Sequence, residues 1–181
     1  MDKKLLEIND QKIFIDFGTG DNFDNVCRFS LKGYYTIIID SLNYNNYNEA
    51  YIKNKQYVDK KIIGDWRNNY DVELADQWAC VSCFEHIKPN DIDSSIKGII
   101  NKIKKNSVGL IYIDLTDHVK ENLGFLHYKK DNFRSIKNTL KFNEWINIFS
   151  KYFTFDCKVS YLKDNKNYER SLLLTNVKLI N

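Results

Sequence analysis

The sequence predicts an α/β protein with a mostly parallel sheet, helices on both faces and an antiparallel hairpin at its carboxyl end. Short apolar runs alternate with amphipathic helical patterns along most of the chain, and this alternation is typical of a parallel sheet covered by helices. A Gly-x-Gly turn directly follows the first apolar run. Two strand-like segments separated by a polar turn at 163–167 end the chain and predict the hairpin.

Short apolar runs and helical patterns give the order of the elements. Runs typical of buried strands cover residues 12–17, 34–40, 60–64, 77–83 and 108–115. Helices are expected over 23–31, 48–53, 90–105 and 142–153. The hairpin strands are expected over 154–162 and 169–179.

Three local signals refine this order. Gly33 is expected to stop the first helix, and Pro89 suits the first turn of a later one. The basic residues between Lys97 and Lys105 are expected to form the solvated end of the helix over 90–105, where cations favour the helix dipole. The long connection 116–138 is rich in charged and aromatic residues, which is typical of a functional loop.

Length and composition favour a single domain spanning residues 1–181. The chain is 43% hydrophobic, enough for a packed core, and 28% charged. Its net charge of +3 is too small to indicate a nucleic-acid partner, which would need basic residues clustered on one face. No apolar stretch opens the chain, so we expect neither a signal peptide nor a membrane span.

The four cysteines are expected to be thiols. They are too few for a disulfide framework in 181 residues. Cys80 and Cys83 form a Cys-x-x-Cys pair, but the sequence holds no second pair to complete a zinc site. These features favour a reducing, cytoplasmic setting.

The first two strands carry a pattern that favours nucleoside binding. Gly18 and Gly20 follow the first strand and precede a helix, which creates a crevice without side chains next to unpaired helix N–H groups. Asp40 ends the second strand about 20 residues after Gly20, where a carboxylate can accept hydrogen bonds from ribose hydroxyls. The alternative is that Asp40 only terminates its strand.

A series of motifs resembles that of class I S-adenosylmethionine-dependent methyltransferases over roughly residues 12–162. The series comprises Asp16-x-Gly18-x-Gly20, Asp40, Ile62–Asp65 and Ala79–Ile87. The later segment Gly109–His118 resembles the fifth strand of members linked to polysaccharide and sugar modification. One departure is Asn22, which stands where a third glycine is common; asparagine tolerates left-handed backbone better than most residues.

The resemblance implies a Rossmann-like, seven-stranded sheet and S-adenosylmethionine as cofactor. It implies that Asp65 binds the adenine amino group and that Ser82 and Cys83 lie near the methionine part. Trp66 supplies an aromatic face to the cofactor or, alternatively, packs in the core. The full set of expected cofactor-binding residues is Asp16, Gly18, Thr19, Gly20, Asp40, Ser41, Asp65, Trp66, Ser82 and Cys83.

The expected catalytic residues follow the fifth strand. A neutral imidazole at His118 can accept a hydroxyl proton, and Asp117 beside it can orient the ring or bind a sugar hydroxyl. The expected substrate-binding residues are His86, His127 and Tyr128, although His86 is often structural in the family. A divalent-metal site at Asp114, Asp117 and His118 would need a bend in an extended segment, so no metal is expected.

These observations predict an S-adenosylmethionine-dependent methyltransferase that transfers methyl to a hydroxyl of a small molecule or carbohydrate precursor. The short lead-in before the first strand leaves open a site completed by a second copy, and hence a homo-oligomer. One alternative is a non-catalytic protein that keeps the fold for binding. A second is a nicotinamide-dependent oxidoreductase, but the further glycine of the dinucleotide pattern and a Tyr-x-x-x-Lys-like pair are absent.

Overall fold

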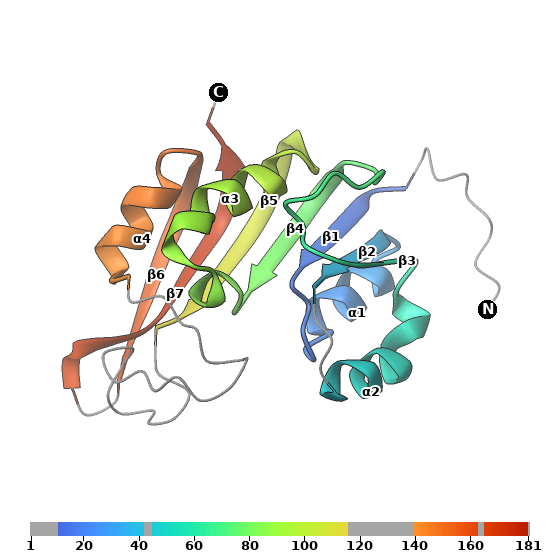
Figure 1. Cartoon of the computed structure of the whole chain (residues 1–181), viewed down its shortest axis with the longest axis horizontal. Helices are drawn as coiled ribbons and strands as arrows, with labels where there is room; N and C mark the ends of the chain where they lie inside the picture. Colours follow the sequence, from blue (N-terminus) through green and yellow to red (C-terminus); the bar gives the residue numbers. More distant parts are fainter. Residues whose placement is uncertain (1–10, 42–44, 116–139, 163–164, 181) are drawn as a thin grey trace. The chain divides into compact units, whose positions relative to one another are not determined.

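The computed structural model describes residues 11–41, 45–115, 140–162 and 165–180. Its strands form one seven-stranded sheet in the order β3-β2-β1-β4-β5-β7-β6 (Figure 1). The strands are β1 (Ile13–Phe17), β2 (Tyr35–Asp40), β3 (Lys60–Ile63), β4 (Ala75–Val81), β5 (Ile103–Asp114), β6 (Phe153–Leu162) and β7 (Asn165–Leu179). The α-helices are α1 (Asp24–Leu31), α2 (Asn45–Asn54), α3 (Ile92–Ile100) and α4 (Phe142–Phe149). The predicted fold class, a mostly parallel sheet with an antiparallel carboxyl-terminal pair, is confirmed.

The chain divides into two compact parts, Met1–Ala79 with Lys97–Ser107 and Cys80–Ile96 with Val108–Asn181. In the first part, β1, β2 and β3 are parallel neighbours, with Ile13 opposite Tyr35 and Asp40 opposite Ile63. All five residues of β1 are buried, as expected for a strand covered on both faces. The Phe29 ring of α1 stacks on Phe14 of β1 at 4.0 Å between centroids, which fixes α1 against the sheet.

In the second part, β7 pairs antiparallel with both β5 and β6. The turn after β4 packs against α4, because the Phe84 ring lies edge-on to Phe149 at 5.0 Å and to Trp145 at 6.2 Å. Phe84, Trp145 and Phe149 are all almost completely buried. The apolar pattern of α4 therefore covers this part of the core, as the sequence predicted.

The helix predicted over 90–105 is wrong beyond Ile100. α3 ends there and β5 begins at Ile103. Ile103 keeps the isoleucine spacing of the helix, but it is the buried first residue of β5, whose burial alternates from Ser107 onward. The Lys102 carbonyl accepts a hydrogen bond from the N–H of Ala75 at 2.9 Å, so strand pairing has begun at that position. The exposed lysines Lys104 and Lys105 consequently lie on β5 and not on a helix end.

Two other boundaries differ from expectation. The helix expected over 48–53 is longer, because α2 runs from Asn45 to Asn54 and continues into a short 3₁₀ turn, Lys55–Tyr57. β4 starts at Ala75 and ends at Val81, earlier than the predicted 77–83. Its end is set by Ser82, whose φ of 52° is incompatible with an extended strand.

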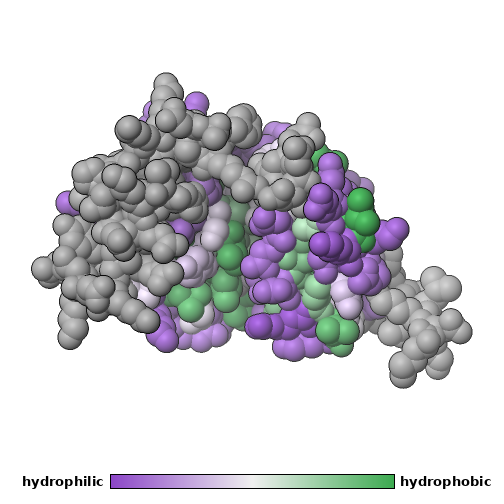
Figure 2. All heavy atoms as spheres, turned by 90° about the horizontal axis from the view of Figure 1, so that it is seen from below, coloured by the Kyte–Doolittle hydropathy of each residue, from purple (hydrophilic) through white to green (hydrophobic). Residues whose placement is uncertain are grey.

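On the face shown in Figure 2, polar residues occupy most of the described surface and apolar ones form smaller areas. None of the described helices combines the length and the apolar character that crossing a bilayer requires.

Candidate functional site

The glycine turn after β1 is tied to the end of β2. Gly18 and Gly20 have φ values of 70° and 59°, a left-handed conformation that glycine adopts without steric cost. The N–H of Gly18 donates to the carbonyl of Ile39 at 2.8 Å. The N–H of Gly20 donates to Oδ2 of Asp40 at 2.6 Å. The two features that predicted nucleoside binding, the turn and the β2 carboxylate, are therefore in direct contact.

Asn22 does not replace a third glycine in the way the sequence suggested. Among the described residues, only Ser82 and Asn176 are non-glycine residues with positive φ, so Asn22 is not left-handed. Its side-chain Oδ1 accepts a hydrogen bond from the N–H of Asp24, the first residue of α1, at 2.9 Å. Asn22 thus satisfies one of the free N–H groups at the start of the helix.

Asp16 and Asp40 form a buried carboxylate pair. Their exposed fractions are 2% and 1%. Burial and, to a smaller extent, the negative charge of Asp40 together raise the pKa of Asp16 to about 8. Asp16 therefore keeps a proton at neutral pH, when an ordinary aspartate is ionised. A cation placed beside this pair would favour loss of that proton, so the pair is suited to a positively charged ligand group.

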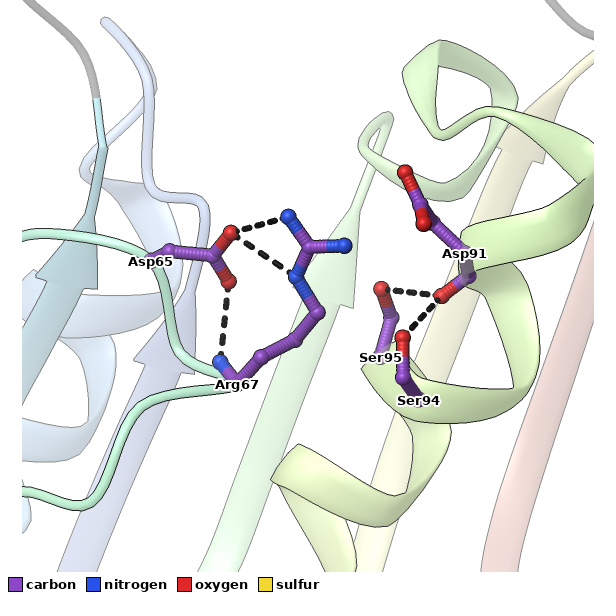
Figure 3. A network of polar contacts seen from close by, with 5 residues as sticks. All are labelled: Asp65, Arg67, Asp91, Ser94 and Ser95. Carbon is purple, nitrogen blue, oxygen red and sulfur yellow. Dashed lines mark hydrogen bonds and ion pairs between the residues drawn. The ribbon is translucent and has the colours of Figure 1, made fainter.

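The end of β3 joins the same group of residues. The N–H of Gly64 donates to the carbonyl of Asp40 at 2.8 Å, which places Asp65 beside the end of β2. Asp65 accepts hydrogen bonds from Arg67, at Oδ1 from the N–H at 2.9 Å and at Oδ2 from Nε at 2.8 Å; Nη2 of Arg67 is also paired with Oδ2 (Figure 3). Burial acts to raise the pKa of Asp65, but the hydrogen bonds and charge of Arg67 outweigh it and lower the pKa. Asp65 is therefore an ionised acceptor held in one position.

The remaining expected cofactor residues of this part differ in exposure. Thr19 is 6% exposed, and its hydroxyl lies 3.5 Å from the carbonyl of Asp16. Ser41 is exposed directly after β2. Trp66 is only 8% exposed, and its ring lies edge-on to Phe17 at 6.3 Å. Of the two roles considered for Trp66, this position supports packing in the core.

The turn after β4, in the second part, carries the other expected donor-site residues. Ser82 is exposed and left-handed, and its N–H donates to the carbonyl of Tyr112 at 2.9 Å. Such a conformation costs a non-glycine residue on the order of 1–3 kcal/mol and is found most often at functional sites. Cys83 is half-buried, with Sγ 3.2 Å from the carbonyl of Val81.

Glu85 and His86 follow in a short 3₁₀ turn, Phe84–His86. Glu85 is 2% exposed, and its Oε1 accepts the N–H of Asp114, the last residue of β5, at 3.2 Å. His86 is half-buried, and its N–H donates to the carbonyl of Cys83 at 2.9 Å. Glu85 thus connects the turn after β4 to the end of β5. At the start of α3, the hydroxyls of Ser94 and Ser95 both donate to the carbonyl of Asp91, the residue before the helix (Figure 3).

The expected catalytic and acceptor residues lie outside the described part of the chain. They are Asp117, His118, His127 and Tyr128. Within the described ranges, no group of three or more metal-binding side chains comes together. The described part of the chain therefore contains the residues expected to bind the cofactor, and the expected catalytic pair lies outside it.

Comparisons with known proteins bear on the fold. No protein-family model and no curated protein sequence matches the chain. Among solved structures, an S-adenosylmethionine-dependent methyltransferase from Clostridium acetobutylicum matches with a TM-score of 0.67 at 14% identity, over 94% of this chain and 85% of its own. The 1,6-didemethyltoxoflavin-N1-methyltransferase of Burkholderia thailandensis, solved with S-adenosylhomocysteine, matches with 0.65 at 12% identity, over 94% of this chain and 72% of its own.

A third match is the N-methyltransferase NodS from Bradyrhizobium japonicum, also solved with S-adenosylhomocysteine. Its TM-score is 0.62 at 10% identity, over 92% of this chain and 78% of its own. These likenesses show that the chain has the fold of class I methyltransferases, as the motif series indicated. Two of the three proteins are named for methylation of nitrogen, and none of the three names refers to a sugar.

Proposed function

We propose that the protein is an S-adenosylmethionine-dependent methyltransferase. The observation that carries the proposal is the contact of Asp40 with the glycine turn, because it places a buried carboxylate and a side-chain-free backbone at one point. The two carboxylate oxygens of Asp40 can accept hydrogen bonds from the two hydroxyls of a ribose placed next to Gly18 and Gly20. The methyltransferase fold, with two of the compared structures solved with S-adenosylhomocysteine, supports the same ligand.

The remaining residues are assigned by their position on the strand ends. Asp65, ionised and fixed by Arg67, accepts a hydrogen bond from the adenine amino group. Asp16 stabilises the ammonium of the methionine part, since a nearby cation favours loss of the Asp16 proton. Thr19 and Ser41 flank the ribose, while Ser82 and Cys83 contact the methionine part.

When bound, S-adenosylmethionine supplies a methyl group activated by a positively charged sulfur. The protein contributes binding, orientation and removal of one proton. Orientation of two reactants can lower a barrier by several kcal/mol. His118, oriented by Asp117, accepts the proton of the acceptor hydroxyl, and a general base of this kind adds on the order of 100- to 10,000-fold. Binding of the methyl acceptor is assigned to His86, His127 and Tyr128.

The acceptor is the finer part of the proposal. The resemblance of Gly109–His118 to members that modify sugars supports a hydroxyl of a small molecule or of a carbohydrate precursor. The four cysteines all lie in the described ranges and none forms a disulfide, which supports a reducing, cytoplasmic setting.

Isothermal titration calorimetry of the folded protein tests the cofactor assignment. We expect S-adenosylmethionine and S-adenosylhomocysteine to bind with micromolar affinity, and reduced nicotinamide cofactor to cause no fluorescence change. A folded protein that binds neither adenosyl ligand would refute the assignment.

Transfer of a labelled methyl group to hydroxyl-bearing acceptors, measured with the native protein and with His118→Ala, tests catalysis. A His118→Ala variant with unchanged transfer would remove His118 from the mechanism.

A further inference from the structure

The connection between β3 and β4 contains no helix or strand. Residues 64–74 run as turns and irregular chain, although Asp65 lies within them. The N–H of Asn68 donates to the carbonyl of Asp65 at 3.0 Å, so residues 65–68 form a turn. A residue on an irregular segment is positioned only as well as the contacts that hold the segment.

Lys102 holds this turn from the segment between α3 and β5. Its side chain is 3% exposed, and Nζ donates to the carbonyl of Trp66 at 2.8 Å, of Asn68 at 2.8 Å and of Gly98 at 3.3 Å. An ammonium group has three N–H donors, so these three carbonyls use all of them. Burial lowers the pKa of Lys102, while the negative charge of Asp65 acts in the opposite direction. Burying a charge is costly unless it is hydrogen-bonded, and here the turn supplies two of the three acceptors.

Two glycines let the backbone of the turn approach its neighbours. A Cβ atom on Gly98 would lie 2.8 Å from the Trp66 carbonyl oxygen and 2.9 Å from Cα of Arg67. Both are backbone atoms, so a side chain at position 98 would push the turn away from α3. A Cβ on Gly64 would lie 1.9 Å from the hydroxyl of Tyr70, so the Tyr70 side chain crosses directly over the residue before Asp65. The turn is thus held by α3, by Lys102 and by Tyr70, whose ring centroid lies 5.8 Å from Nζ of Lys102.

We propose that Lys102 is a positioning residue for adenine recognition: its ammonium group fixes the turn 65–68 and thereby the orientation of the Asp65 carboxylate. The inference rests on the proposed function, because it concerns how well Asp65 reads the adenine amino group. Lys102 does not contact the ligand in this account. Lys102 holds the carbonyls of Trp66 and Asn68 in place. These carbonyls fix the turn, and the turn orients the Asp65 carboxylate that binds the ligand.

A pair of ligands that differ at the amino-bearing edge of the base tests this role. S-Adenosylhomocysteine carries the amino group, whereas S-inosylhomocysteine carries a carbonyl oxygen in its place and a proton on the neighbouring ring nitrogen. Native protein should prefer the adenosine ligand in calorimetric titrations. Lys102→Met should weaken the binding of S-adenosylhomocysteine by about tenfold, the size expected for one impaired hydrogen bond. The affinity for S-inosylhomocysteine should stay within about twofold of the native value. Amide hydrogen exchange over 65–71 should also accelerate without ligand.

Lys104→Met is the matched control, because Lys104 is half-exposed, lies two residues away and pairs with Asp76. It should leave the preference for adenosine unchanged. If Lys102→Met does not fold, Lys102→Arg serves instead. It keeps the charge, but a planar guanidinium cannot direct three N–H groups from one atom. The preference for the adenosine ligand over the inosine ligand should therefore still become smaller.

Each other outcome has one meaning. Equal weakening of both ligands, or an unchanged preference in a folded Lys102 variant, would overturn the positioning role and leave the proposed function standing. Failure of native protein to bind either ligand would refute the proposed function, and the positioning role with it. Native protein that binds both ligands equally would show that Asp65 does not read the amino group.

Discussion

Asp16 and Asp65 lie at the ends of two strands of one parallel set, yet their environments shift their pKa values in opposite directions. Asp16 is 2% exposed, and burial together with the charge of Asp40 raises its pKa to about 8. The side chain of Asp65 is 35% exposed, and Arg67 lowers its pKa despite partial burial. The comparison shows that a place in a motif fixes where a carboxylate lies, whereas its neighbours fix its charge.

The largest expected effect concerns Asp16. Its pKa in the folded protein, about 8, lies above the unfolded value near 4, so the folded state binds the proton more tightly. Its contribution to stability is therefore complete at low pH and is lost as the pH rises from about 4 to 8. Asp16→Asn should remove this slope, and the difference in unfolding free energy between variant and native protein should shift in favour of the variant by about 2–4 kcal/mol from pH 5 to pH 8.

Urea unfolding at pH 5 and pH 8 measures this difference. Asp21→Asn is the control, because Asp21 is an exposed aspartate of the same turn. A difference that does not change between the two pH values would show that Asp16 is ionised in the folded protein, and the contrast with Asp65 would disappear.

A smaller effect is expected for Arg67. Its ion pair with Asp65 is more than one third exposed on both sides, and exposed pairs contribute less than about 1 kcal/mol. Arg67→Ala should therefore lower the unfolding free energy by less than about 1 kcal/mol, while the pKa of Asp65 rises. Carboxyl-carbon NMR titration of Asp65 measures the second effect, and Arg28→Ala on the exposed face of α1 is the control. A loss of unfolding free energy well above about 1 kcal/mol would show that the Arg67–Asp65 ion pair behaves as a buried one.

Much of the first part of the fold was predictable because its signals are local. Apolar runs identify β1 and β2, and the glycine turn with Asp40 follows from spacing along one strand–turn–helix–strand unit. Asn22 shows the limit of such signals. Its residue type suggested backbone freedom, but the structure uses its side-chain oxygen, a choice that depends on where α1 starts.

The contacts around Asp65 were not predictable from the sequence. Lys102 belongs to a basic run that indicated a solvated helix end, yet its ammonium is buried against the backbone of residues more than 30 positions away. The isoleucine spacing through Ile103 fitted a helix, and only pairing with the neighbouring strand distinguishes it from β5. Long-range backbone acceptors leave no trace in a residue pattern, so Arg67 and Lys102 emerge only from the structure.

The central claim is that the Asp40 carboxylate at the end of β2 holds the ribose of an adenosyl ligand, and titration of Asp40→Ala with S-adenosylhomocysteine tests it most directly. A charged acceptor contributes about 1.5–3 kcal/mol per hydrogen bond, so the variant should bind at least about tenfold more weakly than native protein. Asp21→Ala should bind as native protein does, and thermal unfolding should show that both variants are folded. A folded Asp40→Ala protein with native affinity would contradict the claim.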